Sequence, residues 1–142
     1  MRRFALLVLI TVAPAAAAPV PKGVKKKDDV RAVLGKWEGG LGGAAKGGGY
    51  VFRFGDDGTC GITNVGPNNR ESGAAYELHP DKSPRQMTWW NGAERTEWRC
   101  VYELDGDTLK VVFVHAGTDI PPDAAPRAGV TVYELKRMAD DK

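Results

Sequence analysis

The chain has 142 residues, of which 27% are charged and 42% are hydrophobic, and it carries a formal net charge of +2. This length is enough for one domain with a single core, and we expect no second domain. A net charge this small produces no strong electrostatic attraction toward nucleic acid or an anionic membrane surface. We therefore expect neither as a partner.

Residues 1–18 have the features of a secretory signal peptide. A basic start is followed by an apolar stretch from Phe4 to Val12, too short to span a bilayer, and then by a run of alanines suited to cleavage. Loss of this leader removes two arginines and leaves a neutral domain, which we expect to be secreted or periplasmic. We divide the chain into a signal peptide at 1–18, a linker at 19–27, a domain at 28–138 and a tail at 139–142.

The remaining sequence has the two-residue period of β-strands, after a short helix over Val30–Leu34 that Asp28 and Asp29 would cap. Eight segments separated by turn residues carry this period, and they contain Trp37; Tyr50, Phe52 and Phe54; Cys60 and Ile62; Tyr76 and Leu78; Met87 and Trp89; Trp98, Cys100, Tyr102 and Leu104; Leu109, Val111 and Phe113; and Val130–Arg137. Sequential antiparallel strands in this number close most simply into a barrel without exposed edges. We therefore predict an all-β, about eight-stranded antiparallel up-and-down barrel with a short N-terminal helix. A two-sheet sandwich is the alternative.

The first and last strands of such a barrel meet where it closes. Trp37 lies at the start of the first segment and Arg137 at the end of the last. We expect the indole to close the barrel floor with the guanidinium over its face, a cation–π contact of about 0.5–2 kcal/mol. In the sixth segment we expect Trp98, Cys100, Tyr102 and Leu104 to be buried, and Arg99, Val101 and Glu103 to face outward.

Five stretches of the chain share a pattern with a known family. They are Leu34–Trp37, Tyr76–Arg85, Met87 with Trp89, Val101–Val111 and Glu134–Arg137, and together they extend over nearly all of the expected mature chain. The pattern resembles that of small secreted lipocalin-like domains of unknown function, abundant in planctomycete bacteria. The resemblance implies a lipocalin-type barrel with no established activity or cofactor. The family's Arg-Pro and aromatic before the last strand are replaced here by Asp119–Pro126.

Motifs that would indicate catalysis have better structural explanations. Gly40–Ala45 has the spacing of a dinucleotide fingerprint, but no helix follows it, so we expect a loop at the barrel mouth. His79 and His115 have no partner at metal-ligand spacing. No Ser or Cys has a nucleophile context, and Glu94 and Glu97 lie near a hairpin. We therefore expect no enzyme activity, no metal and no cofactor.

Cys60 and Cys100 distinguish the two candidate folds. An oxidising compartment favours a disulfide, worth about 4 kcal/mol. In a barrel, however, the third and sixth strands are separated by three inter-strand spacings of about 4.8 Å each. The Cα atoms of two cysteines joined by a disulfide lie within about 7 Å of each other. We therefore expect unpaired, inward-facing thiols in a barrel, and a disulfide in a flattened barrel or sandwich.

The pattern favours a binding protein. An eight-stranded barrel is either filled by side chains or holds one small molecule, and the large aromatic residues expected to face inward leave little room for a deep cavity. We predict a shallow site for a small apolar ligand at the barrel mouth of a monomer, with Tyr76, Trp89 and Trp98 as walls and the Gly-rich stretch 39–49 as a lid. The alternative is a solid barrel that contacts a protein or a glycan through surface Trp90 and its loops.

Overall fold

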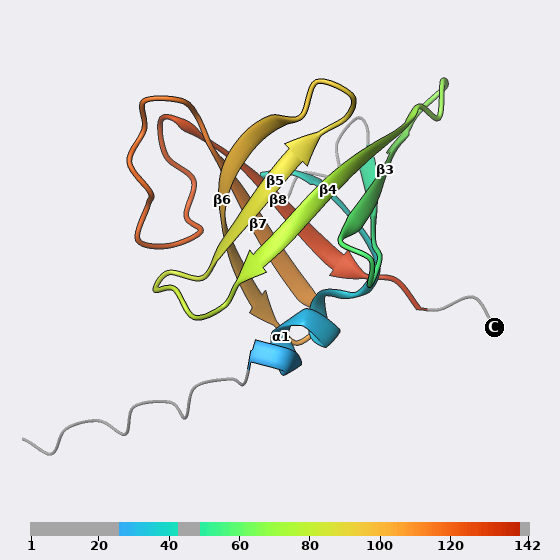
Figure 1. Ribbon diagram of the computed structural model, residues 1–142. Coiled ribbons are helices and arrows are strands. Elements are labelled where there is room, and N and C mark those ends of the chain that lie inside the picture. Colours follow the sequence, from blue (N-terminus) through green and yellow to red (C-terminus); the bar gives the residue numbers. More distant parts are fainter. Residues whose placement is uncertain (1–25, 43–48, 140–142) are drawn as a thin grey trace, which may run out of the picture.

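A closed antiparallel β-barrel is seen in the computed structural model, which describes residues 26–42 and 49–139 (Figure 1). Its strands are β1 (Gly35–Leu41), β2 (Gly49–Phe54), β3 (Thr59–Val65), β4 (Glu71–His79), β5 (Gln86–Asn91), β6 (Thr96–Asp105), β7 (Thr108–Val114) and β8 (Val130–Arg137). Each strand pairs with its neighbours in sequence, and β1 pairs with β8. The predicted eight-stranded up-and-down barrel is confirmed. The expected signal peptide lies outside the described residues.

One helix, α1 (Lys26–Val33), lies across one end of the barrel within the described part of the chain (Figure 1). It begins earlier than predicted, so Asp28 and Asp29 lie in its first turn and do not cap it. Gly35 ends the helical segment with a φ of 110°, a conformation that glycine adopts without strain. None of the described residues forms a helix long and apolar enough to cross a membrane.

Barrel closure brings Trp37 and Arg137 together beneath α1. The two residues are register partners, and the guanidinium carbon of Arg137 lies 4.2 Å from the centre of the indole ring. Trp37 is fully buried, and its Nε1 donates to the Val33 carbonyl at 2.8 Å. Arg137 donates to the carbonyls of Leu34, at 3.0 Å, and Ala32. The contact expected from the sequence therefore also holds the end of α1 against the barrel.

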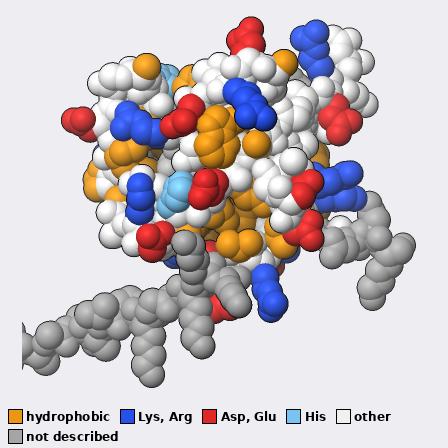
Figure 2. Space-filling model, viewed as in Figure 1, with side chains coloured by type: hydrophobic (Ala, Val, Ile, Leu, Met, Phe, Trp, Pro, Cys, Tyr) orange, Lys and Arg blue, Asp and Glu red, His pale blue; other side chains and the backbone are white. Residues whose placement is uncertain are grey.

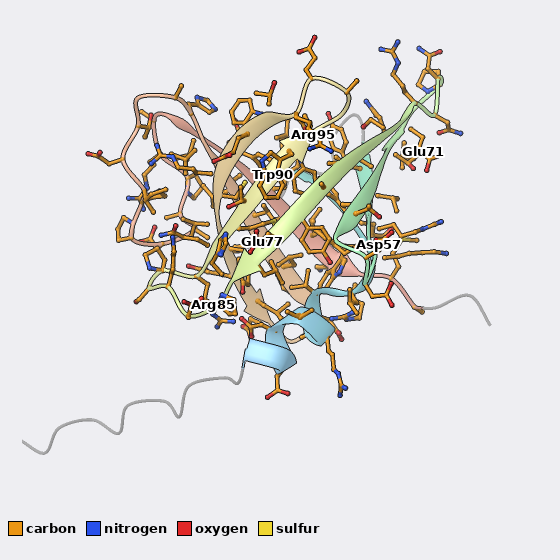
Figure 3. All side chains as sticks on the ribbon, in the orientation of Figure 1. Asp57, Glu71, Glu77, Arg85, Trp90 and Arg95 are labelled. Atoms are coloured by element: carbon orange, nitrogen blue, oxygen red, sulfur yellow. The ribbon has the colours of Figure 1, made fainter. Side chains whose placement is uncertain are left out.

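A buried carboxylate, which the sequence analysis did not anticipate, joins α1 to the barrel wall. Asp29 is only 1% exposed, and among the described residues it is the one buried polar or charged side chain. Its Oδ2 accepts from the Tyr102 hydroxyl at 2.9 Å and from Nη1 of Arg85 at 3.1 Å. Figure 3 shows Arg85 in the β4–β5 loop beside the helix. Val33, four residues after Asp29 and on the same helix face, is also buried, so this face points into the barrel.

Part of the barrel exterior is covered by the long loop between β7 and β8. Val101 faces outward as predicted, but it is fully buried, as is its register partner Val112 on β7, and Val132 beside Val112 on β8 is nearly so. Ala124 from the loop packs against them, and its N–H donates to Oε1 of Glu103 at 2.9 Å. The barrel therefore has a second, smaller apolar cluster on its outer surface.

The inward register of β6 agrees with the prediction, because Trp98, Cys100, Tyr102 and Leu104 all pack in the interior cluster. Trp98 and Leu104 are partly exposed. Cys60 on β3 and Cys100 are both buried as free thiols, which is the outcome expected for a barrel. Burial raises the pKa of Cys60 to about 12, and it also raises the pKa of Cys100 far above the usual range.

We expect neither thiol to react in the folded protein at pH 8. A thiol with a pKa near 12 is ionised there in only about one molecule in 10,000, and burial keeps the reagent out. A chromogenic disulfide reagent should therefore detect no thiol in the native protein. Both cysteines should react in guanidinium without reductant. Detection of no thiol under the denaturing condition would show that they form a disulfide.

Candidate ligand-binding site

A cavity of about 560 Å³ opens at the end of the barrel opposite α1. Strands β2 to β8 all contribute to its lining. Aromatic side chains dominate the lining, namely Tyr50, Phe52, Trp89, Trp98, Phe113 and Tyr133. Small-molecule sites usually have volumes of about 300–1,000 Å³, so the cavity is large enough for one small ligand. Large inward-facing side chains fill the helix end of the barrel and leave space at the other end.

The aromatic rings around the cavity contact one another edge to face. Trp89 is buried at its base, with its ring centre 5.4 Å from that of Phe113 and 6.2 Å from that of Phe52. Tyr133 lies 5.5 Å from both Phe113 and Phe52. Edge-to-face pairs of this kind stabilise one arrangement of the rings. The cavity therefore has fixed apolar walls before any ligand enters.

The polar groups of the lining are uncharged or weakly basic. None of the described lining residues is Asp, Glu, Lys or Arg. His115 Nε2 shares a hydrogen bond with Oγ1 of Thr131 at 2.8 Å, and Nε1 of Trp89 donates to Oδ1 of Asn91 at 2.7 Å. Burial, and to a smaller extent Tyr50, raises the pKa of Tyr133, which therefore stays neutral at physiological pH. The described lining offers apolar contact and hydrogen bonds, and no carboxylate, ammonium or guanidinium group.

Two of the three predicted wall residues, Trp89 and Trp98, line the cavity, and Tyr76 does not. Tyr76 is the register partner of Trp89, but the two side chains extend in opposite directions along the barrel. The Tyr76 hydroxyl donates to the Gly55 carbonyl at 2.8 Å, in the β2–β3 turn near α1, and its ring packs edge-on against Phe54. Burial raises the pKa of Tyr76 to about 12. Tyr76 is therefore part of the filled half of the interior.

The predicted lid is partly a strand. Gly39 lies in β1, so close to β8 that a Cβ atom at this position would be 2.0 Å from the Glu134 carbonyl oxygen. A glycine is therefore needed for the closing pair of strands to approach each other. Leu41 and Gly49 also belong to strands. The rest of the expected lid, residues 43–48, lies outside the described residues.

A second hollow, of about 1,170 Å³, lies on the outer surface beside Trp90. Trp90 is the register partner of Ala75, and its Nε1 donates to Oε2 of Glu97 at 3.4 Å. Gly61 and Gly73, which are register partners, leave backbone exposed at the hollow. Figure 3 shows Trp90 between Arg95 and Glu77, with Glu71 further along the wall, and Figure 2 shows charged groups around the apolar area of this side. This surface is open and of mixed polarity.

The histidines have hydrogen-bond partners within the sheet. Nε2 of His79 shares a hydrogen bond with Oγ1 of Thr88 at 2.9 Å, as His115 does with Thr131. In the part of the chain that the structure describes, no three His, Cys, Asp or Glu side chains lie together in a way that could hold a metal ion.

Comparison of the chain with family models, with curated proteins and with solved structures finds no match of any of the three kinds. The resemblance noted in the sequence is therefore supported only at the level of the fold: a closed, eight-stranded antiparallel barrel with a short helix at one end.

Proposed function

We propose that this protein is a secreted or periplasmic, non-enzymatic binding protein of the lipocalin-like type, which holds one small apolar ligand at the open end of its barrel. The observation that carries the proposal is the cavity of about 560 Å³ walled by six aromatic residues. Burial of apolar surface stabilises a complex by about 25 cal/mol per Å². We expect a monomer to be sufficient for this function, because residues from seven strands of one chain form the described lining.

A neutral apolar dye, N-phenyl-1-naphthylamine, tests the proposal. We expect it to bind with a Kd of about 1 µM, equivalent to about −8 kcal/mol. Its emission should rise and tryptophan emission should fall, because Trp89 and Trp98 form part of the wall. Absence of both changes at about 100 µM dye would contradict the proposal.

Two variants of β4 locate the bound dye. Ser72 lines the cavity, so Ser72→Phe should fill part of it and weaken binding by at least about tenfold, or 1.4 kcal/mol. Ala75 faces outward on the same strand, beside Trp90, so Ala75→Phe should leave the Kd unchanged. The opposite result would place the dye on the outer surface.

A second candidate function is contact with a protein or a glycan through the outer surface around Trp90. The hollow of about 1,170 Å³ beside this side chain favours it. Charges of both signs around the hollow, from Glu71 and Arg95, suit a neutral polar partner better than a polyanion. Trp90→Ala separates the two candidates, because it should abolish such contacts and leave dye binding intact.

A further inference from the structure

Trp98 carries an unusual donor. Its Nε1 is the one buried side-chain nitrogen or oxygen without a hydrogen-bond partner among the described residues. The chain's other tryptophans donate from the same atom, Trp37 to the Val33 carbonyl, Trp89 to Asn91 and Trp90 to Glu97. A buried N–H that loses water and gains no acceptor is unfavourable, so a native protein that keeps one has a use for it or compensates for it elsewhere.

This donor belongs to the wall of the open-end cavity. Trp98 is the register partner of Trp89, and its ring is edge-on to Phe113 and His115, at 6.3 and 6.4 Å between centres. The side chain is partly exposed at the rim, although its nitrogen is covered. For a ligand in the cavity to accept from this N–H, the indole must rotate, because the nitrogen is covered in this structure.

Three polar side chains of the lining near Trp98 already have hydrogen-bond partners. Oδ1 of Asn91 accepts from Trp89, and His115 and Thr131 are bonded to each other. The described lining also has no Asp or Glu to pair with an ammonium group, and no Lys or Arg to pair with a carboxylate. The hydroxyls of Ser72, Tyr50 and Tyr133 also line the cavity, but Nε1 of Trp98 is the buried donor there without an acceptor, so it is the group that gains most from an acceptor on the ligand.

The following inference rests on the proposed function. We propose that the cavity binds a flat, neutral, largely apolar molecule that carries a hydrogen-bond acceptor, such as a ketone oxygen, and that Nε1 of Trp98 donates to this acceptor. The aromatic walls fit a flat ring system. The acceptor of the ligand pairs with the Trp98 N–H. A ligand that has no acceptor leaves this N–H unpaired in the complex.

Two probes of the same shape test this inference: 2-acetylnaphthalene, and 2-isopropenylnaphthalene, in which a CH₂ group replaces the ketone oxygen. In ¹⁵N-labelled protein, the four tryptophans give four indole N–H signals, and Trp98→Phe identifies that of Trp98. We expect the ketone to move the Trp98 proton downfield and the alkene not to do so. The signals of Trp37 and Trp90 serve as internal references, since both residues lie outside the cavity lining and their N–H groups are already bonded.

Affinity provides the second measurement. The ratio of ketone to alkene affinity should fall about fivefold in Trp98→Phe, the worth of one net hydrogen bond. It should not change in Trp90→Phe, on the outer surface. A ketone that binds without moving the Trp98 signal, or an unchanged ratio in a folded Trp98→Phe protein, would overturn the inference and leave the proposed function standing. If neither probe binds at about 100 µM, the proposed function fails as well. If Trp98→Phe does not fold, triple-resonance assignment of the unmodified ¹³C,¹⁵N-labelled protein identifies the Trp98 signal, and its response to the ketone decides the matter.

Discussion

Replacement of Trp37 by alanine is expected to lower the free energy of unfolding by about 3–5 kcal/mol, as other truncations of large buried side chains do. Trp37 is fully buried at the helix end of the barrel, where it bonds to the Val33 carbonyl and lies under the Arg137 guanidinium. Its loss leaves a cavity and removes the surface on which the end of α1 rests. Urea unfolding followed by far-ultraviolet circular dichroism measures the change.

Two further variants show whether burial is the cause. Trp90→Ala, which removes a tryptophan from the outer surface, should cost only about 1 kcal/mol. Arg137→Ala removes the cation–π contact and the bonds to the carbonyls of Leu34 and Ala32, at a cost of about 2–3 kcal/mol. A loss no larger in Trp37→Ala than in Trp90→Ala would refute the structural role of Trp37.

Asp29→Ala is expected to cost about 3 kcal/mol, because removal of one partner from a buried ion pair leaves the others unsatisfied. Arg85 would lose its carboxylate, and the Tyr102 hydroxyl would lose its acceptor. Arg85 is about one-third exposed, so water compensates for part of its loss, whereas Tyr102 is buried. The same urea titration gives the value.

The neighbouring residue provides a matched control for this prediction. Asp28 lies in the same helical turn but is exposed, so Asp28→Ala should change stability by no more than about 0.5 kcal/mol. Asp29→Asn keeps an oxygen for Tyr102 and should fall between the two. Equal effects of Asp28→Ala and Asp29→Ala would show that helix charge, and not the buried network, determines the result.

The barrel could be predicted because each of its hairpins is specified by residues that are close together in the sequence. Period-two alternation and turn sequences such as Gly55–Gly58 define each hairpin, and Trp37 and Arg137 at the ends of the pattern indicate where it closes. The sequence indicates less clearly that part of the outer surface is covered. The indication is that apolar residues stand next to each other: Val101 lies between two inward-facing residues, and Val111 is followed by Val112. Uninterrupted apolar runs of this kind indicate a strand buried on both faces.

Other features depend on three-dimensional packing. An acidic residue before an apolar run predicts a helix cap, and only the docking of α1 shows that Asp29 faces the barrel and meets Arg85. Register places Tyr76 beside Trp89, but it does not show that one side chain extends toward the filled end and the other toward the cavity. The unpaired Nε1 of Trp98 likewise has no signature in sequence, because its neighbours come from other strands.

The pairing of β1 with β8 also has a kinetic consequence. Every other strand pair in the barrel joins sequence neighbours, whereas Arg137 bonds to Leu34 across 103 positions. The entropy lost in closing a loop rises with its length, and folding slows as contacts become more distant in sequence. Hairpins, β1–β2 among them, need only local contacts, but β1 gains its second partner, and the end of α1 its bonds to Arg137, only with the last strand. Until it arrives, both edges of the nascent sheet are open to pairing with other chains.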